Sequence, residues 1–162
     1  MHNYLIREIQ EPEILFLENM LYEAIFIPKG NEKLSRDIIK LPELSRYIKD
    51  FGQLNDICLT AEIEGKLIGA IWTRIFSENE KGFGFVNAET PELSMAVYEQ
   101  NRHQGLGTVL LKAMIQRLKV QNYSQVSLSV DIRNYAYNFY KKYGFKDYKF
   151  IEKSVIMIKN LK

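Results

Sequence analysis

The chain has 162 residues, which fits a single domain that we expect to span residues 1–162. Hydrophobic residues make up 46% and charged residues 26%, and this globular balance excludes disorder of the whole chain. The formal net charge is only +2, so we expect no nucleic-acid partner. The charged N-terminus and the lack of any apolar run of about 18 residues lead us to expect no signal peptide and no membrane contact.

Cysteine and histidine are scarce. The single cysteine, Cys58, cannot form an internal disulfide, and its apolar neighbours favour a small core residue over a reactive thiol. His2 and His103 are the only histidines, so the sequence predicts neither a metal cluster nor a Cys–His nucleophile pair. We expect a cytoplasmic location.

Hydrophobic periodicity and the Gly and Pro positions predict the order of the elements. In chain order they are a strand at 4–9, a helix from Pro12 to about residue 27, a helical stretch at 35–48 broken near Pro42, strands at 57–63 and 66–76 joined by a turn at Glu64-Gly65, a long loop at 77–91, a strand at 93–98, a helix at 105–120, a strand at 126–130, a helix at 135–143, and a hairpin of 145–151 with 155–158.

The strand–helix–strand order over residues 93–130 predicts a parallel pair with a right-handed crossover, whereas the earlier strands look antiparallel. The predicted fold class is therefore α/β of the mixed α+β kind: a central mixed, mostly antiparallel sheet with helices on both faces. A homodimer formed through a sheet edge or the terminal hairpin is compatible with this pattern.

The loop Arg102-His103-Gln104-Gly105-Leu106-Gly107 opens a predicted helix directly after a strand. Backbone N–H groups at a helix N-terminus lack internal partners, and the helix dipole adds positive charge there, so together they form an anion site. Glycine allows a phosphate to approach the backbone closely, and Arg102 and His103 add donors. The alternative is that the glycines serve only a tight turn, and the loop alone does not decide between the two.

Two segments resemble the signatures of the GNAT superfamily of N-acetyltransferases. Residues 97–108 resemble the acetyl-CoA loop of that family, whose pattern is Arg/Gln-x-x-Gly-x-Gly/Ala at the start of a long helix. The run from Ala136 to Phe145 resembles the second signature, Ala-x-x-Leu/Phe-Tyr-x-x-x-Gly-Phe. The resemblance covers nearly the whole order of predicted elements and implies a GNAT-like fold in which the parallel strands splay apart.

The resemblance also implies a site for acetyl-CoA as cosubstrate, with no metal. The backbone of the strand would pair with the pantetheine arm by strand addition, and the loop N–H groups would hold the pyrophosphate. The cofactor-binding residues implied are Met95, Ala96, Val97, Arg102, His103, Gln104, Gly105, Leu106, Gly107, Thr108, Asn134 and Tyr140.

Asn134 departs from the family pattern, which places Asn seven residues before the tyrosine. Arg133 stands at that position, and Asn134 follows one residue later. Asn134 is expected either to contact the cofactor or to cap the following helix, and the sequence supports both roles equally.

Tyr140 and Glu92 are the candidate catalytic residues. Tyr140 occupies the position of the family's frequent general acid, near the thioester sulfur, although a tyrosine among aromatic neighbours on a helix commonly packs against a sheet. Glu92 begins a strand and is the first candidate for the base, because some relatives use Glu there. The alternative is that Glu92 is merely solvated.

The predicted reaction is transfer of an acetyl group from acetyl-CoA to a primary amine, by direct attack in a ternary complex. The acceptor, a small molecule or a peptide, is not identified by any residue run. Tyr22, Phe26 and Trp72 are candidate lining residues, with Trp72 favoured as core. The aromatics of residues 83–85 could cover an acceptor or a dimer contact. A non-catalytic acyl-CoA-binding or regulatory domain is the alternative, and a scaffold for another phosphate ligand is a third interpretation.

Overall fold

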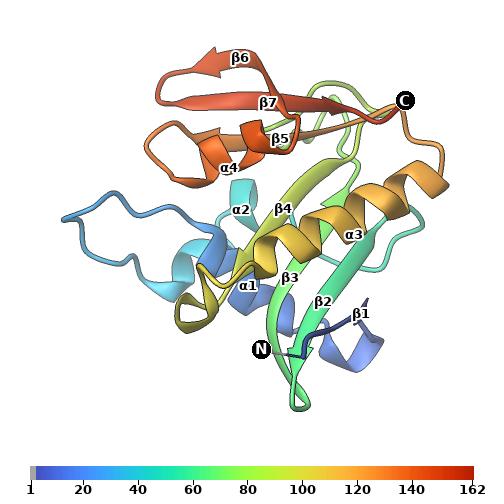
Figure 1. The fold of residues 1–162 in the computed structure, drawn as a ribbon. Coiled ribbons are helices and arrows are strands. Elements are labelled where there is room, and N and C mark those ends of the chain that lie inside the picture. The colour runs from blue at the N-terminus through green and yellow to red at the C-terminus, as the bar shows by residue number, and fades with distance from the viewer. Residues whose placement is uncertain (1–2) are drawn as a thin grey trace.

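A seven-stranded sheet organises residues 3–162, the part of the chain that this computed structural model describes (Figure 1). The strand order is β1-β2-β3-β4-β5-β7-β6. The strands are β1 (Leu5–Glu8), β2 (Ile57–Ile63), β3 (Lys66–Arg74), β4 (Glu92–Val97), β5 (Gln125–Asp131), β6 (Lys146–Ile151) and β7 (Ser154–Asn160). The helices are α1 (Phe16–Ala24), α2 (Pro42–Ser45), α3 (Leu106–Val120) and α4 (Ala136–Lys142), with short 3-10 turns η1 (Glu11–Glu13), η2 (Arg36–Lys40) and η3 (Glu99–Asn101).

All neighbouring strands are antiparallel except β4 and β5, which run parallel. This pair has a single register match, Glu92 with Ser127, whereas β5 and β7 pair along their whole length. Beyond that match β4 and β5 diverge, which leaves one edge of β4 without a strand. The predicted mixed sheet and its splayed parallel pair are confirmed.

Helices cover both faces of the sheet (Figure 1). One face buries the apolar stripe of α3, with Leu110, Met114 and Leu118 fully enclosed, and α4 contributes to the same core. The opposite face buries α1 and the segment after α2 against Trp72. The sheet can bury both faces because successive side chains of a strand point to opposite sides. Trp72 is 1% exposed and therefore a core residue, as favoured from sequence.

The first helix is shorter than predicted. Pro12 lies in the separate turn η1, and the long helix α1 ends at Ala24, after which Ile25 is extended. The Arg102 guanidinium lies 3.3 Å from the carbonyl oxygen of Glu23, so the last turn of α1 gains a cationic donor where its own carbonyls lack partners. Periodicity along residues 25–27 therefore reflects burial of an extended segment rather than helix.

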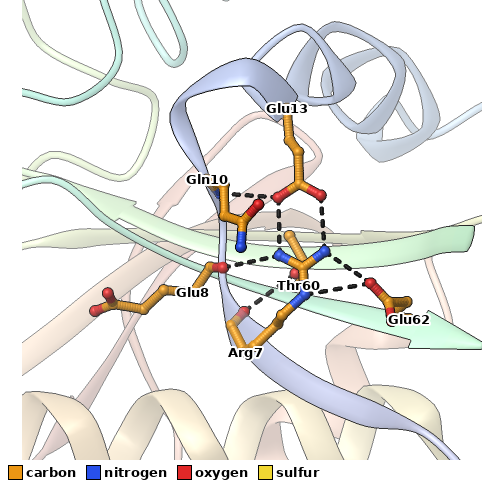
Figure 2. Close-up of polar contacts among 6 residues, drawn as sticks. All are labelled: Arg7, Glu8, Gln10, Glu13, Thr60 and Glu62. Atoms are coloured by element: carbon orange, nitrogen blue, oxygen red, sulfur yellow. Dashed lines mark hydrogen bonds and ion pairs between the residues drawn. The ribbon is translucent and has the colours of Figure 1, made fainter. Parts of the chain in front are cut away.

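An ion cluster fastens the N-terminal edge of the sheet (Figure 2). Arg7 on β1 donates to both carboxylate oxygens of Glu13, at 2.8 and 2.7 Å, and to Glu62 on β2 at 2.7 Å. The Gln10 N–H also donates to Glu13. The hydrogen bonds from Arg7 lower the pKa of Glu13 to about 2, so this carboxylate is charged over the whole neutral range.

We predict that Arg7→Met lowers the free energy of unfolding at neutral pH by about 1 kcal/mol, because it leaves partly buried carboxylates without their donor. Glu13 has a lowered pKa in the folded state, so its contribution is present above the ordinary value of 4.5 and is lost as the pH falls through about 2. Urea unfolding of both proteins across this range measures the effect. The difference in unfolding free energy between the wild type and Arg7→Met should be largest at neutral pH and shrink in acid. The control is Lys66→Met, which removes an exposed charge. A difference that does not vary with pH would contradict the assignment.

Candidate active site

The divergence of β4 from β5 opens two adjoining pockets. The large pocket, of about 870 Å³, is lined by β4, by the last turn of α1 and the segment that follows it to Leu34, and by the loop before α3. The small pocket, of about 540 Å³, is lined by the other end of β4, by β5 and by the turn between β6 and β7. Met95, Asn134 and Tyr140 line both pockets, so the two meet at these residues.

The loop before α3 presents free backbone donors to the large pocket. His103 and Gly105 have φ angles of 61° and 83°. Both lie in the left-handed region, which glycine adopts without the steric cost of a side chain, and this explains the glycine at position 105. Among residues 3–162, the backbone N–H groups of His103, Gln104, Gly105, Leu106, Gly107 and Thr108 have no hydrogen-bond acceptor. They stand at the positive end of a 15-residue helix, so the loop has the geometry of an anion site.

The side chains of this loop are used in different ways. Arg102 lines the large pocket, but its Nε donates to the Val97 carbonyl at 2.9 Å and its Nη2 lies 3.1 Å from the Glu23 carboxylate. Gln104 bonds to Tyr4 and to the Gln100 carbonyl and does not line the pocket, so only its backbone can serve a ligand there. The guanidinium of Arg102, which was expected to serve the anion, is therefore paired with Glu23 of α1.

The open edge of β4 runs along the large pocket at Met95, Ala96 and Val97. The side chain of Ala96 is buried against the α1 face, while Met95 and Val97 face α3. Within the part of the chain that the structure describes, no strand pairs with this edge on the β5 side beyond Glu92. Its outward-facing backbone groups are therefore available to an extended ligand, except that the Val97 carbonyl already accepts Arg102 Nε.

Asn134 lines both pockets and also caps α4. Its side-chain oxygen accepts the N–H of Ala136 at 2.9 Å, so the capping role is present in the structure. Arg133, which stands at the position of the family's asparagine, pairs instead with Asp131 at 2.7 Å. The side-chain oxygen of Asn134 is therefore committed to the helix.

Tyr140 of α4 is 7% exposed and packs edge-on against Phe139 and Phe145. Tyr140 belongs to the core, as the packing alternative has it, and it also lines the junction of the two pockets, while its role as general acid stays a prediction. Burial raises the pKa of Tyr140 above its ordinary value. Its hydroxyl therefore keeps its proton at neutral pH and can donate it.

Glu92 is buried, not solvated. It is 3% exposed, lies on the small pocket, and its Oε1 accepts the Gly84 N–H at 3.0 Å while its Oε2 accepts the hydroxyl of Tyr47. Burial raises the pKa of Glu92 to about 7, against the two hydrogen bonds, which lower it. A carboxylate with a pKa near neutrality is suited to take and return a proton.

Tyr47 and the glycines around Phe83 were not predicted as site residues. Tyr47 lies 45 positions before Glu92 in the chain, and nothing in the local sequence marks it as a neighbour. Phe83 lines the small pocket and stacks on the Tyr47 ring with a centroid distance of 6.2 Å. That residues 83–85 cover an acceptor or a dimer contact stays a prediction. Tyr22 and Phe26 line the large pocket, and Phe26 also lines the small one.

The two pockets differ in charge. The large pocket carries all the basic residues of the site, from Lys29 and Lys33 to Arg102 and His103, besides Glu23 and Glu99. The ionisable side chains of the small pocket are acidic or phenolic, and its remaining walls are mostly apolar. This contrast favours an anionic ligand on one side and a cation with an apolar neighbour on the other.

Residues 3–162 contain no group of three or more His, Cys, Asp or Glu placed to hold a metal ion. Within the same residues, the helices are too short or too polar to cross a bilayer.

Comparison with known proteins agrees with this geometry, which is that of an acyltransferase of the N-acetyltransferase class. The family model described as the acetyltransferase (GNAT) domain matches residues 55–147. An N-alpha-acetyltransferase of Sulfurisphaera tokodaii is 41% identical over 119 residues, covering 68% of this chain and 71% of the relative. The chain therefore belongs to the GNAT family, and it is an acetyl-CoA-dependent N-acetyltransferase.

Solved structures share the fold. An acetyltransferase of the GNAT family from Staphylococcus aureus Mu50 superposes with a TM-score of 0.72 at 20% identity, covering 99% of this chain and 100% of the other. The PaiA N-acetyltransferase of Thermoplasma acidophilum, solved in complex with coenzyme A, gives a TM-score of 0.67 at 23% identity and covers 98% and 99%. At these identities the likeness bears on the fold alone.

Proposed function

We propose that this enzyme transfers the acetyl group of acetyl-CoA directly to the α-amino group of a peptide or protein N-terminus, with Glu92 as general base and Tyr140 as general acid. The observation that carries the proposal is that Glu92, buried and with a pKa near 7, lines the same small pocket as Tyr140, which in turn reaches the large pocket. The acid and the base thus flank the junction where donor and acceptor would meet.

We assign acetyl-CoA to the large pocket. The free N–H groups of residues 103–108 fit a pyrophosphate, and the unpaired edge of β4 at Met95 to Val97 fits the amide-bearing pantetheine arm. With the anion held on the loop, the thioester would lie toward the junction at Met95, Asn134 and Tyr140. Asn134 would contribute through its side-chain NH₂, since its oxygen caps α4.

The chemistry follows from the protonation states. An aliphatic ammonium must lose a proton before it can attack, and the Glu92 carboxylate would take that proton, directly or through a water. The neutral amine would attack the thioester carbonyl, with amide N–H groups of β4 near the developing oxyanion. As the C–S bond breaks, the hydroxyl of Tyr140 would protonate the departing thiolate, and the proton still carried by the attacking nitrogen would pass to the Tyr140 phenolate, directly or through a water. Glu92 would release the proton of the original ammonium to solvent, so that one proton leaves in each cycle.

The small pocket supports a cationic acceptor with an apolar flank. Its charged residues are Glu92, Asp131 and Glu152, of which Asp131 is paired with Arg133 outside the lining, and no lining residue is basic. Leu21, Leu44 and Phe83 provide apolar walls beside Glu92. An N-terminal α-ammonium followed by an apolar side chain matches both properties, and the Sulfurisphaera tokodaii relative is itself named an N-alpha-acetyltransferase.

A cytoplasmic location and a homodimer stay predictions. The buried free thiol of Cys58 fits a reducing compartment.

We predict that Glu92→Gln lowers kcat/KM by about 10²-fold or more at neutral pH, because the amide cannot accept the proton. The acidic limb of the kcat/KM profile, which follows deprotonation of Glu92 near pH 7, should lose this titration. Thiol release from acetyl-CoA at varied pH measures both effects. Exposed Glu89→Gln is the matched control, and unchanged turnover of Glu92→Gln would remove Glu92 from the mechanism.

We predict that Tyr140→Phe slows turnover by about an order of magnitude or more, with little change in the KM for acetyl-CoA, because the thiolate loses its proton donor. The ring is retained, so the core packing should persist. Tyr137→Phe is the control, because Tyr137 of the same helix lines neither pocket and its hydroxyl donates to Asp147. An undiminished kcat would exclude the acid role of Tyr140.

We predict that peptides with a free α-amino group and an apolar first residue are better acceptors than peptides that begin with an acidic residue, because the small pocket is acidic and apolar. Thiol release on a panel that also contains polyamines and N-terminally blocked lysine peptides measures the preference, and mass spectrometry locates the acetyl group. Preference for lysine or polyamines would contradict the acceptor class. Cofactor binding without turnover on any amine would support the alternative of a regulatory acyl-CoA-binding domain.

A further inference from the structure

We propose that Tyr47 is a positioning residue that holds the Glu92 carboxylate in its working orientation. Tyr47 belongs to the segment after α2 and lines the small pocket beside Glu92. The proposal rests on the proposed role of Glu92 as the base. It assigns Tyr47 no direct step in the reaction.

Both oxygens of the carboxylate are held by fixed donors. The Tyr47 hydroxyl donates to Oε2, and the Gly84 N–H donates to Oε1 at 3.0 Å. The Tyr47 oxygen in turn accepts the Phe83 N–H at 2.7 Å, so its own proton is directed toward Glu92. With one donor on each oxygen, the carboxylate cannot rotate without breaking a hydrogen bond in a buried site.

Tyr47 is itself held from several sides. Trp72 Nε1 donates to its backbone carbonyl at 3.2 Å, and Arg74 donates to the carbonyls of Arg46 and Lys49 at 2.8 and 2.7 Å. Arg74 is anchored in turn by Asp56 at 2.7 Å. The segment that carries Tyr47 is thus fastened to β3, which is the strand beside Glu92.

Residues 82–84 pack against the Glu92 carboxylate and supply its second hydrogen-bond donor. A Cβ atom on Gly82 would overlap Glu92 Oε1, and one on Gly84 would lie 2.7 Å from the backbone carbon of Leu128. The Ser127 hydroxyl also donates to the Gly84 carbonyl at 2.7 Å. The backbone therefore approaches Glu92 as closely as only glycine permits, and the Gly84 and Phe83 donors are fixed relative to β5.

The same hydrogen bonds set the titration of Glu92. Burial raises the pKa of this carboxyl, and the bonds from Tyr47 and Gly84 lower it by stabilising the charged form. The other ionisable groups around Glu92 are Arg74, its register partner on β3, and three residues that line the small pocket, Asp131, Tyr140 and Glu152. Loss of the Tyr47 donor should therefore move the pKa of Glu92 upward.

The test is the pH profile of kcat/KM for Tyr47→Phe, with one acceptor for all enzymes so that the titration of the amine is shared. The ring stays packed on Phe76 and Phe83, and only the hydroxyl is lost. We expect the acidic limb to move up by about one pH unit, and kcat/KM at pH 7 to fall about fivefold while the KM for acetyl-CoA is unchanged. Tyr123→Phe, at the far end of α3, should match the wild type.

A fold check and a second substitution keep the outcome decisive. A thermal shift with CoA shows whether Tyr47→Phe is folded. If it is not, 3-fluorotyrosine is placed at position 47 instead. Its hydroxyl is a stronger hydrogen-bond donor than that of tyrosine, so the acidic limb of kcat/KM should move to lower pH. An acidic limb that stays in place in a folded variant would overturn the proposal for Tyr47. If Glu92→Gln retains the wild-type profile, the base assignment fails instead, so the two failures are separable.

Discussion

The divergence of β4 and β5 after one matched pair is the constraint on which the site depends. Full pairing of these strands, as between β5 and β7, would bury the edge of β4 and leave no room for either pocket. The backbone groups that a closed sheet would satisfy internally are instead offered to a ligand. The anion loop, the open edge and the Tyr140 junction all line the space that this divergence creates.

The divergence is held open by the packing around it. Tyr140 and Phe139 of α4 sit at the mouth of the gap, and the 82–84 backbone is inserted beside Glu92 and Leu128. Arg102 links the end of β4 to the end of α1 through the Val97 and Glu23 carbonyls. Arg102 belongs to the anion loop, so its side chain connects that loop to β4 and to α1, which both line the large pocket.

Much of the fold follows from sequence because its signals are local. The period-2 strands, the α3 stripe and the Gly105 turn each lie within one short segment, and the structure has them where they were predicted. The small pocket could not be predicted in this way. For Glu92 the sequence left open a base and a solvated strand end. Tyr47 and Gly84 enclose its carboxylate, and those contacts join segments 45 and 8 residues away. The end of α1 at Ala24 was also not predicted, and its last turn contacts Arg102, which lies 79 positions beyond Glu23.

The burial of Glu92 also constrains how the sequence can evolve. A carboxyl whose pKa is raised by burial weakens the native state whenever it is ionised, so at neutral pH the enzyme is less stable than its fold would allow. A neutral residue of similar shape would relieve this cost. Selection for heat tolerance alone would therefore tend to discard the acid, and its retention would require selection for turnover.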